Sequence, residues 1–286
     1  MILALFNYIL AISPTTRIVL LVIFFVGMFA VVFSRFYMFF EQRYASKYKR
    51  PFFVHFYLFK KRLDKEKQSI LRRQFSFYQK LDDTEKVRFE HRVATFINSK
   101  YFLGREDLVV TTEMKVLVAA TSTMLTFGFR DYQIDLIDKI IIYPGTFYSN
   151  SNEAYHKGEL NPKLKALVIS WEDFLYGYDD ENDNINLGIH EFTHAIHLNS
   201  LKNNDVSSLI FKVAFSELTD MLSAEEKLRK QLIASKYFRD YAFTNQFEFV
   251  AVIVETFIET PEEFKRQFPR IYDKTREMLN FNFAQY

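Results

Sequence analysis

The chain has 286 residues, enough for one or two domains with a sizeable core, and its 49% hydrophobic content excludes a disordered protein. With 37 basic and 35 acidic residues the net charge is +2, so the overall charge indicates no polyanionic partner. Cysteine is absent, which excludes disulfide bonds, cysteine-ligated zinc and thiol catalysis, and the small numbers of glycine (7) and proline (6) favour helices.

The N-terminal part of the chain is strongly apolar. Residues 1–16 are too short to span a bilayer, and we expect them to lie at its outer interface. The run Ile18–Phe40 contains one charged residue, Arg35, and as a helix it would be roughly 34 Å long, about the thickness of a bilayer core. A buried core helix and a cleaved signal peptide both fit this run less well. We therefore predict a transmembrane helix over residues 17–40.

Basic residues gather on the C-terminal side of this span. Only Arg17 precedes it, whereas the following basic residues are Arg35, Arg43, Lys47, Lys49, Arg50, Lys60, Lys61 and Arg62. The positive-inside rule predicts a single-pass protein of the cell (inner) membrane whose remaining residues face the cytoplasm. Residues 41–75 form a basic juxtamembrane segment with interleaved aromatic side chains. We expect this segment to contact anionic lipid headgroups, and we expect no nucleic-acid partner.

Residues 76–286 are predicted to form one helix-rich α+β domain. Capping residues and apolar periodicity predict, in chain order, helices over 82–97 and 114–127, strands over 140–143 and 166–171, an acidic loop over 178–184, a helix beginning near 185, and helices over 209–223 and 246–257.

Three of the six histidines lie in the stretch His190-Glu191-Phe192-Thr193-His194-Ala195-Ile196-His197, which contains an H-E-x-x-H pattern. Histidines four residues apart on a helix share a face and can hold one zinc ion through their imidazoles. Glu191 can then reach a zinc-bound water as general base. A solvated polar face is the weaker interpretation, because apolar residues are interleaved with the polar ones. His197 lies on the same face, and we expect it to support the site or the fold because a fourth protein ligand would close it.

A peptidase site needs a third protein ligand. Glu217, Glu248 and Glu255 are candidates, and their spacing alone does not choose between them. Glu248 also has a structural explanation, because Asn245-x-x-Glu248 is the pattern of a capping box and would need this glutamate without any metal.

The H-E-x-x-H stretch, together with Tyr241-Ala242-Phe243-Thr244-Asn245-Gln246-Phe247-Glu248-Phe249-Val250-Ala251-Val252, resembles the MtfA-type zinc-dependent peptidases. That family carries HEFAH and then a tyrosine seven residues before a glutamate in an N-x-x-EFFAV segment. Thr111–Ala120, Val168–Trp171 and Pro261–Tyr272 also look like family segments, so the resemblance covers roughly residues 76–286.

The resemblance implies a zincin-like fold, related in motif to the catalytic domain of anthrax lethal factor. It implies one Zn²⁺ with three protein ligands, His190, His194 and Glu248. Glu191 becomes the general base, and Tyr241 becomes the group that stabilises the oxyanion. His197, where family members often have aspartate, and Glu255 are candidates for supporting roles around the ligands. The family is associated with sugar-uptake regulation through a transcriptional repressor, and its soluble members lack the membrane span.

We therefore expect a membrane-anchored zinc peptidase that hydrolyses a peptide or protein substrate, with aminopeptidase and endopeptidase action both open. The strand Ala166–Trp171 is expected to bind an extended substrate by β-addition. The alternative is a membrane-tethered regulatory binding protein of the same fold that captures a transcriptional regulator or another protein partner. The intact Glu191 argues against this alternative, because a structural zinc site has no use for a base. A hydrolase acting on another amide is a third, weaker hypothesis.

Overall fold

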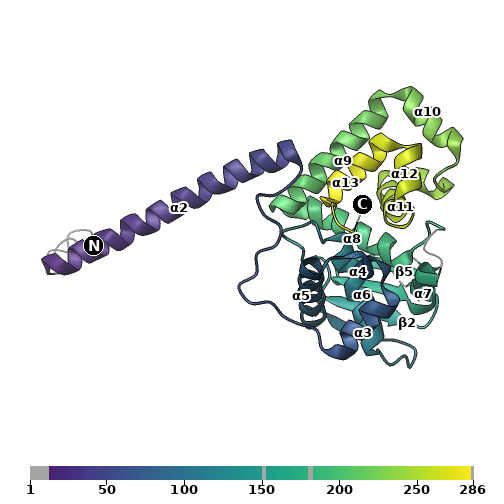
Figure 1. Ribbon diagram of the computed structural model, residues 1–286, viewed down its shortest axis with the longest axis horizontal. Coiled ribbons are helices and arrows are strands. Elements are labelled where there is room, and N and C mark those ends of the chain that lie inside the picture. The colour runs from purple at the N-terminus through teal and green to yellow at the C-terminus, as the bar shows by residue number, and fades with distance from the viewer. Residues whose placement is uncertain (1–12, 150–152, 180–182, 285–286) are drawn as a thin grey trace. The chain divides into compact units, whose positions relative to one another are not determined.

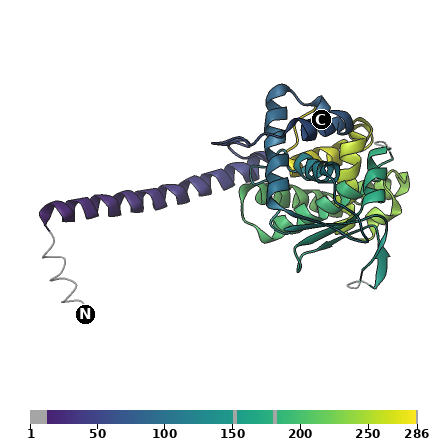
Figure 2. The ribbon, with the colours of Figure 1, turned by 90° about the horizontal axis from the view of Figure 1, so that it is seen from below.

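The computed structural model describes residues 13–149, 153–179 and 183–284 (Figures 1 and 2). Contacts between residues divide the chain into two compact units, residues 1–44 and 45–286. The predicted interfacial segment lies mostly outside the described residues, because it is described only from residue 13 onward.

The described part of the first unit is almost entirely α2, a single helix over Pro14–Tyr48 that ends in the second unit. Among the described residues it is the one helix long and apolar enough to cross a membrane, and none of its most apolar 18-residue window is buried. The core helix of a soluble protein would be mostly buried. The length, apolar composition and exposure of α2 therefore suit a membrane anchor or a signal sequence. The helix runs past the predicted end at Phe40 because no glycine or proline interrupts the chain before Pro51.

The second unit begins in the last turn of α2 and is a helix-rich α+β domain, which confirms the predicted fold class. Its first half contains α3 (Lys65–Gln74), α4 (Ser76–Lys80), α5 (Asp83–Ser99), β1 (Tyr101–Gly104), α6 (Thr112–Leu125), β2 (Lys139–Tyr143), β3 (Phe147–Ser149), β4 (Ala154–His156), β5 (Gly158–Asn161) and β6 (Ala166–Ser170). Its second half contains α7 (Trp171–Asp179), α8 (Leu187–Lys202), α9 (Val206–Ala224), α10 (Glu226–Ser235), the 3-10 helix η1 (Asp240–Phe243), α11 (Gln246–Glu259), α12 (Pro261–Gln267) and α13 (Pro269–Leu279).

The main sheet has the strand order β1-β2-β6-β5. β1, β2 and β6 are parallel to their neighbours, whereas β5 is antiparallel to β6, with Gly158 opposite Ile169. β6 is therefore paired on both sides and has no free edge for another strand. The prediction that Ala166–Trp171 binds substrate by β-addition is wrong for this reason, and Trp171 already begins α7. β5 is the strand at that end of the sheet.

One hydrophobic core joins the sheet to the surrounding helices. α6 is apolar on nearly all sides and has an almost completely buried centre, Val116–Ala120. α8 packs against α6 and the sheet, and also against α9 and α11, so it lies between the two halves of the domain (Figure 1). This position makes α8 a rigid platform for a functional site.

The core also includes side chains that precede residue 76. Leu63, Ile70, Leu71 and Phe75 are at most 7% exposed and belong to the same cluster as the rest of the domain. The predicted domain boundary at residue 76 thus divides a packed unit, because apolar positions of α3 face the core behind a basic surface. We place the start of the domain at Ala45.

Candidate metal centre

The H-E-x-x-H stretch lies in the first half of α8. Asn186 begins this helix, since its side chain accepts the backbone N–H of Ile189 at 3.1 Å and donates to the carbonyl of Gly177 at 2.6 Å. His190 and His194 are one turn apart, and their ring centroids lie 4.5 Å from each other. The two imidazoles thus share one face of the helix, as their spacing predicts.

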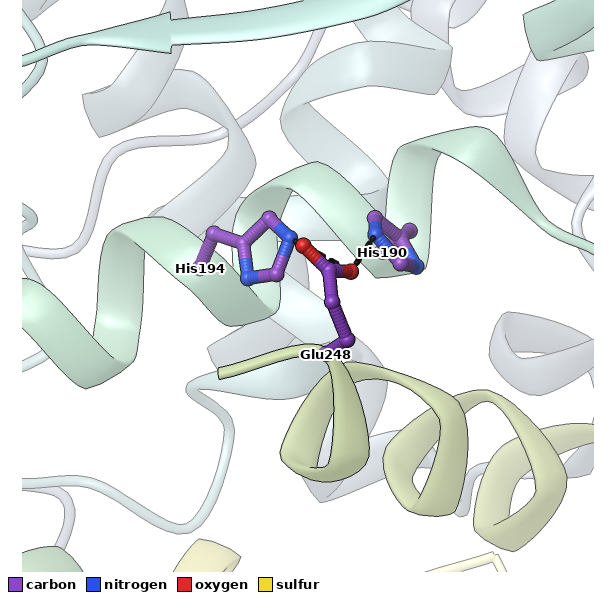
Figure 3. Close-up of side chains that lie close together, drawn as sticks. All are labelled: His190, His194 and Glu248. Atoms are coloured by element: carbon purple, nitrogen blue, oxygen red, sulfur yellow. Dashed lines mark ion pairs between the residues drawn. The ribbon is translucent and has the colours of Figure 1, made fainter. Parts of the chain in front are cut away.

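The carboxylate of Glu248 joins the histidines from α11 (Figure 3). Its Oε2 lies 3.1 Å from Nε2 of His190 and 3.5 Å from Nε2 of His194. Ligand atoms of the three residues all lie within 4.8 Å of one another, so this group could hold a metal ion. The helix cap does not need the glutamate, because Asn245 alone accepts the backbone N–H groups of Phe247 and Glu248.

The arrangement of lone pairs suits a cation. Oε2 of Glu248 is buried and faces Nε2 of both histidines. Nδ1 of His190 lies 2.7 Å from Oε1 of Glu255, so this nitrogen carries the proton and Nε2 turns a lone pair toward Glu248. Two such acceptors at 3.1 Å repel each other unless a proton or a metal ion is shared between them. Two imidazole nitrogens and a carboxylate oxygen form a donor set that zinc accepts.

Without a metal ion, a proton occupies this position. Burial alone would lower the pKa of His190, but the carboxylates of Glu248 and Glu255 outweigh burial and raise it to about 10. Burial and the neighbouring His190 lower the pKa of His194 to about 3. A metal ion must therefore displace a proton from His190 when it binds.

A buried carboxylate fixes the orientation of His190. Glu255 of α11 is 1% exposed, and its Oε1 lies between Nδ1 of His190 and the guanidinium of Arg239, 2.8 Å away. Its Oε2 accepts the backbone N–H of Asn186 at 2.8 Å. The positive charge of Arg239 and these hydrogen bonds offset the cost of burying the carboxylate. Glu255 therefore lies where a supporting carboxylate was predicted.

Glu191 is buried beside the histidines and close to the sheet. Burial raises its pKa to about 7, with the carboxylates of Glu248 and Glu159 adding to the effect and His190 opposing it. A Cβ atom added to Gly158 of β5 would lie 2.6 Å from the Cγ and Oε1 of Glu191. The absence of a side chain at Gly158 thus makes room for the glutamate, and the pKa near neutrality suits a group that both accepts and donates protons.

Two aromatic residues flank the cluster. Tyr241 of η1 is 52% exposed, and its ring centroid lies 6.1 Å from that of His190. Burial of its hydroxyl and the nearby Glu248 raise its pKa to about 12, which keeps it a hydrogen-bond donor at neutral pH. Phe247 stacks on His194 with ring centroids 4.0 Å apart and planes 8° from parallel. The stacking holds the imidazole of His194 in place.

The other two candidates lie outside this group. His197 is buried among the rings of Phe211, Phe215 and Phe247, with centroids 4.7 to 5.8 Å away, and this is a packing environment. Glu217 of α9 forms ion pairs with Lys49 and Lys274, each at 2.7 Å. The fold thus brings Glu248 to the histidines and leaves Glu217 in a network of charges.

A pocket of about 650 Å³ opens beside His190. Its lining comes from the segment around β3 and β4, from α7, from the start of α8, from the residue before η1 and from α11. It includes Thr146, Lys157, Glu172, Tyr176, Leu187 and Arg239. Sequence reasoning missed Arg239 and Gly158. Arg239 lies in an irregular segment two residues before Tyr241, where no sequence pattern indicates a contact. Gly158 begins a four-residue strand in which apolar and polar residues do not clearly alternate.

A His-His-Glu cluster with a buried glutamate, held between two helices of a helix-rich α+β domain, is the arrangement expected of a metallopeptidase. The family model for the glucose-regulated metallo-peptidase M90 matches residues 48–279. The chain therefore belongs to this family, which confirms the resemblance to the MtfA-type peptidases. Membership of the family implies a metal ion.

Individual relatives are distant. The chain is 24% identical over 234 residues to an uncharacterized protein of Synechocystis sp., covering 77% of this chain and 85% of the relative. It is 21% identical over 210 residues to the Mlc titration factor A of Yersinia pestis and to that of Yersinia pseudotuberculosis, covering 67% of this chain and 76% of each relative.

Proposed function

We propose that this chain is a zinc-dependent peptidase, anchored in the inner membrane with its domain in the cytoplasm. One observation carries the proposal. The ligand atoms of His190, His194 and Glu248 converge on one point beside the buried Glu191, and the chain belongs to a metallo-peptidase family. These three residues would hold the zinc ion. When bound, zinc supplies a Lewis acid that makes water acidic near neutral pH.

Glu191 acts as the general base and then as the general acid. It takes a proton from the attacking water and gives it to the leaving amine, and its raised pKa of about 7 suits both transfers. Tyr241 donates a hydrogen bond to the developing oxyanion from its side-chain hydroxyl. Glu255 and Arg239 keep Nε2 of His190 directed at the site.

The substrate lies along β5. This strand is at the end of the sheet, and its first residue, Gly158, contacts Glu191. An extended peptide paired with β5 would bring a peptide bond to the general base. The pocket beside His190 would receive the neighbouring side chains of the substrate.

A regulatory protein partner is the second candidate function. The Yersinia relatives are named Mlc titration factor A, and a titration factor is a molecule that sequesters another. A chain of the same family could capture a regulator at the membrane, with the metal in a supporting role. The buried Glu191 beside the cluster favours catalysis over capture alone.

The test is a mass-spectrometric search for peptides cleaved by the purified full chain in detergent, with and without a chelator. We expect cleavage that the chelator abolishes and that added zinc restores. Cleavage that persists unchanged in the chelator would overturn the zinc mechanism. A complete absence of cleavage in zinc-loaded protein, together with tight capture of one partner, would favour the binding function.

A further inference from the structure

The loop between α2 and α3, residues 51–62, presents two opposite sets of side chains. It contains no helix or strand. The inward set is buried or half-buried and consists of Pro51, Val54, His55 and Tyr57. The outward set consists of exposed large apolar residues, Phe52, Phe53, Phe56, Leu58 and Phe59.

A buried arginine attaches this loop to the domain. Arg92 of α5 is 0% exposed, and it contacts the hydroxyl of Tyr57 (2.6 Å), Nδ1 of His55 (3.2 Å) and the carbonyl of Val54 (3.5 Å). The same guanidinium also donates to the carbonyls of Thr126, Phe127 and Phe129. At the end of the loop, the N–H of Lys61 donates to Nδ1 of His91 at 2.8 Å. The loop is therefore fixed to the domain, and its outward side chains are displayed by a rigid support.

The outward side chains are exposed to a degree that needs an explanation. Phe56, Leu58 and Phe59 are 69%, 81% and 89% exposed, and the rings of Phe53 and Phe56 lie 6.2 Å apart. Scattered single apolar residues are normal on a protein surface, whereas a cluster of large ones marks a contact with another protein or with a membrane.

Charge distinguishes between these two partners. From residue 42 to residue 63 the chain has seven basic residues and no acidic one. The exposed Arg50, Lys60, Lys61 and Arg62 flank the apolar side chains on both sides. The first acidic residue after the loop, Asp64, is engaged as the N-cap of α3. Aromatic rings flanked by lysine and arginine are complementary to the interface of an anionic bilayer.

The position of the loop in the chain also indicates a bilayer. Phe52 follows the last residue of α2, Tyr48, by four residues, so at most about 14 Å of extended chain separates them. A helix that spans a membrane would place the start of this loop near the headgroups.

We propose that residues 51–62 form a second membrane contact, separate from the span. The outward aromatic and leucine side chains enter the interfacial layer of an anionic bilayer, and the flanking basic side chains meet the headgroup phosphates. Because the loop is fixed to the domain through Arg92, this contact orients the whole domain on the membrane surface. The proposal rests on the proposed anchoring by α2 and adds a partner surface that α2 does not supply.

The absence of cysteine allows a direct test on the full chain. Single variants Phe59→Cys, Val22→Cys and Leu164→Cys are labelled with a polarity-sensitive nitrobenzoxadiazole fluorophore and reconstituted in phosphatidylcholine liposomes, with and without phosphatidylglycerol. Val22 lies in the predicted span, and Leu164 is an exposed residue of the turn between β5 and β6. We expect blue-shifted emission and quenching by spin-labelled lipid at positions 22 and 59, stronger at 59 with the anionic lipid, and neither effect at 164.

Water-like emission at position 59 together with quenching at 22 would overturn the loop contact and leave the anchor intact. Loss of quenching at both positions would overturn the anchor and the loop contact together. A blue shift at 59 that grows with protein concentration and ignores the lipid quencher would show a contact between two copies of the chain instead. Zinc content and peptide cleavage are also measured on each variant. These two measurements show whether the proposed peptidase function fails, independently of whether the loop contacts the membrane.

Discussion

His190 has contacts on both ring nitrogens, and these contacts decide how the candidate site works. Nδ1 of His190 donates its hydrogen to Glu255, so Nε2 faces the metal position and Glu248. The sequence predicted His190, Glu191 and His194, because a helical spacing of four residues is enough to place two imidazoles together. It could not predict the ion pair of Arg239 with Glu255, because that contact depends on how η1 packs against α11.

At this scale the third ligand can be tested first. Glu248→Ala removes the carboxylate that faces both histidines, so zinc content should fall from about one per chain to a small fraction, while Glu217→Ala should keep it. Atomic absorption on the purified full chain measures both variants. The reverse pattern, with zinc lost only from the Glu217 variant, would discard Glu248 as a ligand.

The close approach of Gly158 to Glu191 makes a second test. In Gly158→Ala the added Cβ would lie 2.6 Å from the glutamate side chain and must displace it. Peptide hydrolysis should then fall about 10²-fold or more, since general-base catalysis is worth that much, while zinc content is unchanged. Gly145→Ala is the matched control, because its Cβ would meet only the end of the flexible Glu172 side chain at 3.3 Å. Equal activity in the two variants would contradict the placement of Glu191.

At the scale of elements, the helices with clear caps are confirmed. Asp82, Thr111 and Asn245 each accept the backbone N–H groups that open a helix, as their sequence positions predict. The short strands β1, β3, β4 and β5 were not predicted, because three or four residues carry too little periodicity. β6 was predicted as a strand, but its position inside the sheet could not be predicted. That position depends on which strands pair with β6, and the sequence of β6 alone does not contain this information.

The attachment of the loop over residues 51–62 predicts a pH dependence. Burial, with the nearby Arg92, lowers the pKa of His55 to about 3, against 6.5 when unfolded. Between pH 6.5 and 3 the unfolded chain therefore binds a proton that the folded chain does not, so stability falls as the pH falls through this window. From pH 7.5 to pH 5 the loss due to His55 is at most about 2 kcal/mol.

Urea unfolding of the metal-free chain in detergent, followed through the single tryptophan, Trp171, measures this loss. The variant His55→Gln should lose less stability between the two pH values than the unchanged chain does. Identical losses in both proteins would show that His55 takes up its proton as readily in the folded state as in the unfolded state.

At the scale of the whole molecule, one long apolar helix precedes a domain that carries the candidate site. The domain begins at Ala45, earlier than the basic composition of residues 41–75 predicts, because α3 and α4 place apolar side chains in the common core. Basic residues on the outer face of these helices dominate the composition of the segment. The few apolar residues that pack into the core are too rare to show in the composition.

The orientation of the anchor follows from the basic residues after the span. A reporter fused after Tyr286 should behave as a cytoplasmic protein, because the positive-inside rule retains the C-terminal side of α2 in the cytoplasm. Paired alkaline phosphatase and green fluorescent protein fusions measure this in cells. Phosphatase activity with a dark fluorescent fusion would reverse the topology.

The most direct test of the central claim is zinc content and peptide hydrolysis measured together on Glu191→Gln. Glutamine is nearly isosteric with glutamate but cannot accept the proton of the attacking water. Zinc should stay near one per chain, since His190, His194 and Glu248 are unchanged, and hydrolysis should fall by about 10²–10⁴-fold. Hydrolysis at close to the original rate, with zinc still bound, would contradict the assignment of Glu191 as the general base and the peptidase mechanism built on it.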